Sequence, residues 1–164
     1  HGGVDQAVYA YRVEDYAFWS AELERGIPNG TFGENLTMSG LPDYGLMIGD
    51  RLEFGGLVLE ATAPRIPCNV FAAEMKDQQF PKLFTAAGRA GVYFRVLSPG
   101  KVKAGMQGKY SFKAENSLST QALFLDQTGP LNKLNKDKLR RYLDLPIDER
   151  TRKKFTTRLQ KAKP

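Results

Sequence analysis

The single cysteine of the chain, Cys68, is the side chain best suited to nucleophilic or metal chemistry. It follows Pro64-Arg65-Ile66-Pro67. Because each proline fixes φ at about −65° and lacks an N–H donor, we expect a stiff loop that presents the thiol in a defined direction. The nearby guanidinium of Arg65 favours the thiolate, which is the form that attacks electrophiles or binds soft metals. The alternative is a small buried apolar side chain, because free cysteines are among the most buried residues.

Other polar side chains in the first two thirds of the sequence could complete a site around this loop. Arg89 and Arg95 carry planar guanidinium groups, which bind phosphate and other oxygen-rich ligands through paired donors. Glu34 and Asn35 could contact the same ligand. Each residue also has a simpler interpretation, since arginines form surface ion pairs and Glu and Asn side chains cap backbone groups.

A β-hairpin is expected to deliver the cysteine loop. Residues 51–54 and 57–62 are rich in strand-forming side chains and flank Gly55-Gly56, a pair typical of a tight turn. The other elements expected in this part of the chain are a strand at 5–11, a helix at 13–23, a turn entering a strand within 31–41, short helices at 70–75 and 80–87, a strong strand at 91–97, and short strands at 102–104 and 109–113.

Beyond Glu115 the period of the apolar residues changes from two to about 3.6, which predicts helices. Asn135 and Asp148 stand where the second and third helices would begin. The three apolar stripes are Leu118, Ala122 and Leu125; Leu139, Tyr142 and Leu143; and Phe155, Leu159 and Ala162. Because such short helices are unstable alone, they must pack on one another or on the sheet. We therefore expect a strand-rich domain over residues 1–114 and a helical domain over residues 117–164.

Several motifs, in their order and spacing, resemble those of the MOSC domain, which is named after the C-terminal part of molybdenum cofactor sulfurase. They are His1-Gly2-Gly3, Phe32-Gly33-Glu34-Asn35, Ile48-Gly49-Asp50-Arg51, Pro64-Arg65-Ile66-Pro67-Cys68 and Gly88-Arg89-Ala90-Gly91-Val92-Tyr93. The likeness runs from His1 to about Lys113, and the helical tail resembles the 3-alpha domain of stand-alone bacterial members of the YiiM type. The resemblance implies a mostly β fold with α-helices, namely a MOSC-type β-barrel followed by a three-helix appendage.

The same resemblance implies further strands ahead of the His-Gly-Gly motif, because the family's barrel begins before it. We therefore expect that a chain extended upstream of His1 is more stable than these 164 residues alone.

The resemblance also implies that the protein binds the molybdenum cofactor (molybdopterin), with Cys68 as catalytic residue and metal ligand. A soft thiolate suits molybdenum. The cofactor-binding residues that it implies are His1, Gly2, Gly3, Glu34, Asn35, Arg65, Arg89 and Arg95. The implied activity is that of an oxidoreductase that reduces N-hydroxylated substrates such as hydroxylaminopurine, with a redox partner protein as electron donor.

Two other functions stay open at this point. Cys68 could carry a persulfide and deliver sulfur to a metal centre, or the chain could be a non-enzymatic module that binds a partner through its basic tail. Residues 133–164 carry 12 Lys and Arg against 4 Asp and Glu, whereas residues 1–132 carry 12 against 14. We interpret this tail as a solvated surface and not as a nucleic-acid reader, because Tyr142 and Phe155 fall on the apolar stripes.

Composition excludes several other classes of protein. The only histidine is His1, so the chain cannot assemble a Ser-His-Asp triad or a His-rich zinc site, and it has no Walker A motif. No apolar run approaches the roughly 18 residues of a membrane span, so we expect no membrane partner. One cysteine cannot form an internal disulfide, which fits a reducing cytoplasm.

Limited proteolysis tests the division into two domains. We expect the first cuts near Ala114–Ser117 or Gln127–Asn132, because the apolar period changes at the first segment and turn-forming residues fill the second. Mass spectrometry of the fragments locates the cuts. A first cut within Leu57–Thr62 would contradict this division.

Overall fold

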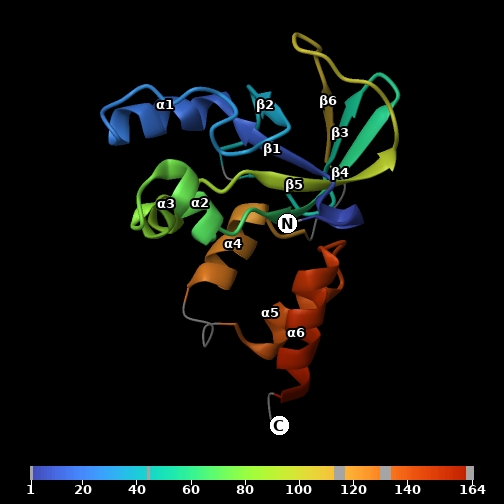
Figure 1. Ribbon diagram of the computed structural model, residues 1–164. Coiled ribbons are helices and arrows are strands. Elements are labelled where there is room, and N and C mark those ends of the chain that lie inside the picture. The colour runs from blue at the N-terminus through green and yellow to red at the C-terminus, as the bar shows by residue number, and fades with distance from the viewer. Residues whose placement is uncertain (1, 44, 113–116, 130–133, 162–164) are drawn as a thin grey trace.

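The tight turn at Gly55-Gly56 forms the hairpin on which the sheet is built. The computed structural model describes residues 2–43, 45–112, 117–129 and 134–161 (Figure 1). Gly55 has a φ of 61°, a conformation that glycine adopts without steric cost. Strands β3 (Arg51–Phe54) and β4 (Leu57–Pro64) pair antiparallel on either side of this turn, with Phe54 opposite Leu57. The predicted hairpin is confirmed.

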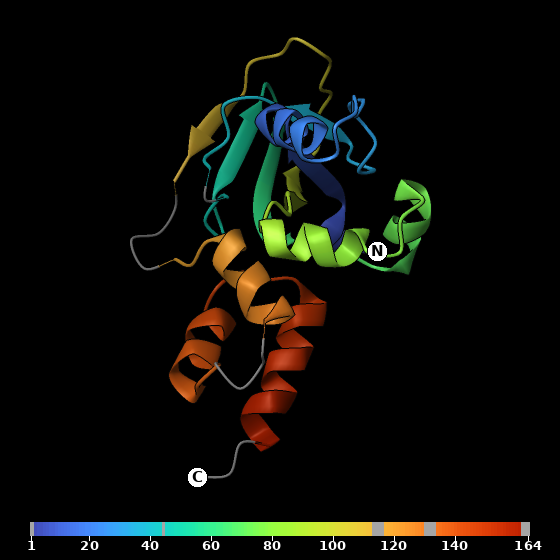
Figure 2. The ribbon, with the colours of Figure 1, turned by 90° about the vertical axis from the view of Figure 1, so that its left-hand side faces the viewer.

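Six strands form one mixed sheet that curves into a half-barrel (Figures 1 and 2). Its order is β2-β1-β5-β4-β3-β6, and only the β1–β2 pair is parallel. The other strands are β1 (Val8–Arg12), β2 (Leu36–Met38), β5 (Val92–Ser98) and β6 (Lys109–Ser111). A trough of about 900 Å³ lies between the edges formed by β2 and β6, with Leu52 and Phe54 among its apolar lining.

Three helices cover one end of the half-barrel: α1 (Val13–Glu22), α2 (Asn69–Met75) and α3 (Phe80–Ala87) (Figure 1). They enclose a cluster of aromatic side chains in which Trp19 stacks on Phe84, with ring centroids 5.7 Å apart. The Trp19 Nε1–H donates to the Tyr11 hydroxyl at 2.7 Å, so the largest side chain of the core is also satisfied as a donor. This packing fixes the helices that flank the cysteine loop.

Two predicted strands differ from the structure. Residues 5–11 divide into a 3₁₀ helix, η1 (Val4–Gln6), and strand β1, and the hydrogen bond from Gln6 N–H to Gly3 O closes the helical turn. Residues 102–104 form no strand. Met106 N–H donates to Lys103 O at 3.2 Å, so the chain makes a turn there instead of extending the sheet.

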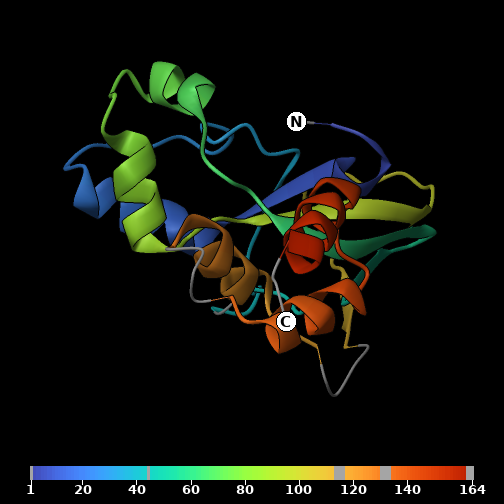
Figure 3. The same cartoon turned by 90° about the horizontal axis from the view of Figure 1, so that it is seen from below.

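The last three helices form the appendage predicted from the change of period (Figure 3). They are α4 (Thr120–Thr128), α5 (Lys136–Leu143) and α6 (Glu149–Lys161). The Asn135 side chain accepts the Lys138 N–H at 2.8 Å, which confirms Asn135 as the cap of α5. Tyr142 and Phe155 are fully buried, so the tail's aromatic residues serve packing. Ala162, expected on the third stripe, lies outside the described residues. None of the helices in the described part of the chain is long and apolar enough to span a bilayer.

Arg95 of β5 joins the half-barrel to the appendage. Its Nη2 lies 3.1 Å from Asp5 Oδ1 and donates to the backbone oxygens of Pro146 and Ile147 at 3.1 and 3.3 Å. The other oxygen of the Asp5 carboxylate accepts the Glu149 N–H at 2.9 Å. Because one guanidinium contacts both η1 and the segment before α6, it sets where α6 begins relative to the sheet.

Replacing Arg95 with Met should therefore destabilise the protein. The change removes charge-assisted hydrogen bonds to partly buried acceptors, so we expect a loss of about 2–4 kcal/mol in the free energy of unfolding. Urea denaturation followed by circular dichroism measures this loss. The control, Arg141→Met on the exposed surface of α5, should change stability by less than about 0.5 kcal/mol. Equal effects of the two changes would show that the junction does not depend on Arg95.

Candidate functional site

The loop that carries the thiol lies between the end of β4 at Pro64 and the start of α2 at Asn69. Cys68 is the N-cap residue of α2, with an extended backbone, and its carbonyl oxygen accepts the Phe71 N–H at 2.9 Å. The cysteine is half-buried, neither sealed in the core nor fully in solvent. This placement agrees with the stiff loop expected from the two prolines.

Arg65 lies against the aromatic core at the base of this loop. Its guanidinium carbon is 5.1 Å from the ring centroid of Tyr9 and 4.9 Å from that of Phe71. The positive charge over the ring faces holds the group in place. A Cβ at Gly33 would be 3.6 Å from Arg65 Nη1, so the side chain also reaches the segment before β2. The Nε atom is buried and has no hydrogen-bond partner among the described residues.

Tyr93 of β5 shares the surroundings of Arg65 and Cys68. Burial raises the pKa of its hydroxyl, the charge and hydrogen bonding of Arg65 lower it, and the Cys68 thiol raises it. Tyr9 pairs with Tyr93 across the β1–β5 ladder, and their ring centroids are 4.9 Å apart. Sequence reasoning assigned no role to either tyrosine. Both tyrosines lie on segments that the sequence predicts to be strands. Only the pairing register of these strands shows that the two residues are neighbours.

Glu34 and Asn35 each bind neighbouring groups of the protein through one side-chain oxygen. Glu34 Oε1 accepts hydrogen bonds from the Tyr16 hydroxyl at 2.6 Å, the Gly30 N–H at 2.8 Å and the Thr37 hydroxyl at 2.7 Å. Asn35 clamps Tyr9, because its Oδ1 accepts the Tyr9 N–H and its own N–H donates to Tyr9 O, both at 2.8 Å. These contacts position Tyr9 beneath Arg65. The predicted contact of Glu34 and Asn35 with a cofactor stays a prediction.

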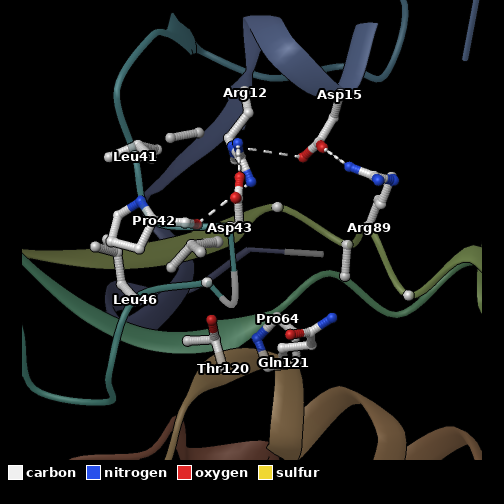
Figure 4. Close-up of a pocket in the computed structure, with 16 residues that line it drawn as sticks. Arg12, Asp15, Leu41, Pro42, Asp43, Leu46, Pro64, Arg89, Thr120 and Gln121 are labelled. Carbon is white, nitrogen blue, oxygen red and sulfur yellow. Dashed lines mark hydrogen bonds and ion pairs between the residues drawn. The ribbon is translucent and has the colours of Figure 1, made fainter. Parts of the chain in front are cut away.

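Arg89 lies in a different cavity, of about 40 Å³, between the sheet, α1 and α4 (Figure 4). The Asp15 carboxylate stands between the guanidinium groups of Arg89, at 2.5 Å, and Arg12, at 4.0 Å. Arg12 also pairs with Asp43. Arg89 covers the Phe18 ring at 4.1 Å. The two guanidinium groups are paired with carboxylates, and the cavity is large enough for water but too small for a pterin.

Arg95, Gly2 and Gly3 lie near the start of α6. Arg95 is engaged at the junction described above, and His1 lies outside the described residues. Gly2 and Gly3 are exposed and line a cavity of about 260 Å³ together with Asp148 and Arg150. The structure thus brings Arg65 and Cys68 together with Tyr9 and Tyr93, whereas Arg89 and Arg95 are bound by their own partners.

The donor set around the thiol is sparse. Among the described residues, no group of three or more His, Cys, Asp or Glu side chains could hold a metal ion. Cys68 could offer a metal a single soft sulfur ligand.

Comparison with known protein families identifies the family of this chain. The profile of the MOSC domain matches residues 1–107, which is more than half of the chain. This chain belongs to the MOSC domain family. The match covers the hairpin, the cysteine loop and strand β5, and it confirms the resemblance found in the motifs.

Relatives and solved structures agree with this assignment. The chain is 36% identical over 121 residues to the uncharacterized protein YflK of Bacillus subtilis, covering 74% of this chain and 55% of that protein. It is 31% identical over 107 residues to the protein YiiM of Escherichia coli, covering 63% of this chain and 48% of that one. The chain therefore spans about half the length of these relatives. A protein of Gibberella moniliformis named a reductase is 35% identical over 109 residues, which cover 64% of this chain and 19% of that protein.

The crystal structure of YiiM from Geobacillus stearothermophilus superposes with a TM-score of 0.88 at 28% identity, over 96% of this chain and 80% of that one. The structure of YiiM from Escherichia coli superposes with a TM-score of 0.86 at 23% identity, over 98% and 81%, and shows the same fold. The half-barrel and the appendage are therefore a YiiM-type MOSC architecture.

Replacement of Glu34 with Ala should destabilise the segment beneath Arg65. Three donors would lose one carboxylate acceptor, so we expect the free energy of unfolding to fall by about 2–3 kcal/mol in urea denaturation. Glu22→Ala at the exposed end of α1 is the matched control and should change it by less than about 0.5 kcal/mol. A loss for Glu34→Ala no larger than for the control would mean that its carboxylate is not structural.

Proposed function

We propose that the protein binds the molybdenum cofactor through Cys68 and reduces N-hydroxylated compounds, with hydroxylaminopurine as the model substrate. The observation that carries this proposal is the lone thiol beside Arg65, in a loop that belongs to the MOSC domain. A thiolate suits molybdenum because both are soft.

The residues around the thiol fit such a ligand. The Arg65 guanidinium, held over Tyr9 and Phe71, would bind an oxygen-rich group of the cofactor with its planar donors, and its unpartnered Nε adds one more. The buried rings of Tyr9 and Tyr93 would lie on the inner side of the bound cofactor and limit the entry of water. When bound, the cofactor would supply the two-electron redox chemistry of molybdenum, and Cys68 would be the residue that holds the metal through Sγ.

A proton donor is also needed, because cleavage of an N–O bond releases water and consumes protons. The Tyr93 hydroxyl is the neighbouring candidate, because a phenol is protonated at neutral pH and Tyr93 shares the surroundings of Arg65 and Cys68. In this proposal it is a catalytic residue that donates a hydrogen bond or a proton to the departing oxygen.

Persulfide transfer by Cys68 is the competing function, since a half-buried thiol near a guanidinium also suits sulfur transfer. The similarity to a protein named a reductase supports the first function. Binding of a partner through the basic tail would need neither the thiol nor Arg65, so Cys68 variants separate it from both.

The decisive experiment measures molybdenum and reductase activity in protein purified from a host that makes the cofactor. Cys68→Ala should lose bound molybdenum and hydroxylaminopurine reduction while its melting temperature stays nearly unchanged. Cys68→Ser should behave similarly, because oxygen is a harder donor. Arg65→Gln should lower the molybdenum content, whereas the matched change Arg89→Gln should retain it, because Arg89 is bound to Asp15 in another cavity.

Two outcomes would overturn the proposal. Molybdenum retained by Cys68→Ala together with activity would remove the thiolate as ligand. Wild-type protein that carries a persulfide, seen by intact mass spectrometry, and no molybdenum would establish the sulfur carrier instead.

A further inference from the structure

Helix α6 carries a row of basic side chains on one side. Arg150, Lys154, Arg158 and Lys161 recur every three or four residues, so they fall within about 80° of one another around the helix axis. Arg150, Lys154 and Lys161 are exposed, and Arg158 is half-buried. At about 1.5 Å per residue, the row is about 16 Å long. We call these four residues the basic row.

The basic row has no structural partner in the part of the chain that the structure describes. None of its four side chains forms an ion pair there, whereas the neighbouring Lys153 lies 3.4 Å from Glu149. Phe155 of the same helix is fully buried, so α6 packs on the rest of the appendage through another side. Like charges four residues apart repel one another and destabilise a helix. An anionic partner that covers the row would relieve this repulsion.

The surroundings of the row fit an acidic protein better than a nucleic acid. Exposed carboxylates accompany the basic side chains, with Glu149 in the first turn of α6 and Asp137 in that of α5. The dense phosphates of a duplex would meet these carboxylates as like charges. In the described residues of the appendage, the aromatic rings of Phe124, Tyr142 and Phe155 are buried and cannot stack on bases. A protein surface, which can present both signs of charge, avoids both difficulties.

The row begins beside a segment that is bound to the candidate site. Arg150 and η1 line the same cavity of about 260 Å³. In η1, the Asp5 carbonyl oxygen accepts the Thr62 hydroxyl at 2.6 Å, and this hydroxyl also lies 3.1 Å from Tyr93 O. A protein that covers the start of the row would therefore also lie against η1, which packs on β5, the strand of Tyr93.

We propose that the basic row of α6 docks the electron donor of the proposed reductase, a flavin or iron–sulfur protein with carboxylates clustered on its surface. The inference rests on the proposed function for the identity of this partner. Reduction of an N-hydroxylamino group breaks the N–O bond, forms an N–H bond and releases the oxygen as water. It consumes two protons and two electrons, and the donor protein is oxidised by those two electrons. Attraction between the charged surfaces speeds the encounter while the complex stays weak and short-lived.

Two electron sources separate docking from chemistry. Hydroxylaminopurine reduction by cofactor-loaded protein is measured with reduced methyl viologen, which needs no docking surface, and with NADPH plus clarified host extract, which contains protein donors. In Lys154→Glu the extract-driven rate should fall about tenfold at low ionic strength, while the viologen-driven rate stays within about twofold. The control, Lys101→Glu in the exposed turn after β5, makes the same charge change and should leave both rates unchanged. An extract-driven rate in Lys154→Glu equal to that of the wild type would overturn the proposal.

Cross-linking tests the surface without any turnover. A benzophenone side chain replaces either Thr157, exposed on the side of α6 that carries the row, or Thr156, exposed about 100° away around the helix. Irradiation in host cells should join a protein to position 157 and not to position 156, and mass spectrometry should identify a flavin or iron–sulfur protein of net negative charge. Once purified, this protein should bind Lys154→Glu about tenfold more weakly than the wild type at low salt.

The docking surface and the proposed function can fail separately. Viologen-driven reduction in a protein that captures no acidic redox protein at position 157 would remove only the docking surface. Capture of such a protein by a chain that holds no molybdenum would remove only the cofactor. Binding of a short DNA duplex that Lys154→Glu abolishes, with no protein captured, would assign the basic row to nucleic acid and overturn the proposal.

Discussion

The pairing of β4 with β5 is the constraint on which the site and the junction both depend. Ala63 pairs with Tyr93 next to the cysteine loop, and Glu60 pairs with Arg95 next to the appendage. An irregularity between Ala61 and Ala63 shifts the register, and there the buried Thr62 hydroxyl contacts Tyr93 O at 3.1 Å and Asp5 O at 2.6 Å. One short stretch of ladder therefore fixes Tyr93, η1 and the approach to Cys68.

Arg12, Arg65, Arg89 and Arg95 fall into two groups with different physical roles. Arg12, Arg89 and Arg95 have carboxylate partners and serve to join elements. Arg65 is held by aromatic faces, which restrain its orientation and leave in-plane donors available apart from the hydrogen bond with Tyr93. A guanidinium group that is already paired with a carboxylate has few donors left for a ligand, so Arg65 is the arginine suited to recognition.

Sequence predicted the elements whose signals are local. The Gly55-Gly56 turn, the Asn135 cap and the apolar stripes of Tyr142 and Phe155 need only near neighbours, and all three are confirmed. The failures were of another kind. Residues 102–104 fitted a short strand, but the Lys103 carbonyl oxygen accepts the Met106 N–H and so belongs to a turn around Gly105. The MOSC resemblance supplied the fold, which no local pattern could have given.

The candidate site was predicted only where chain neighbours define it. Arg65 and Cys68 lie on one loop, so their proximity follows from spacing. Tyr9 and Tyr93 meet through a strand register across 84 residues of sequence separation. The partners of Arg89 and Arg95 are equally remote in sequence. Motif membership alone could not separate arginines that face a ligand from those that join elements.

The junction role of Arg95 gives this motif residue a route to function that does not require contact with the ligand. Its guanidinium binds the oxygens of Pro146 and Ile147, immediately before α6 begins, and it also pairs with Asp5, which accepts the Glu149 N–H. The position of the first turn of that helix relative to the sheet therefore depends on Arg95. Because Arg95 lies on β5, the strand that also carries Tyr93, a half-buried arginine with structural partners can affect the candidate site without touching the ligand.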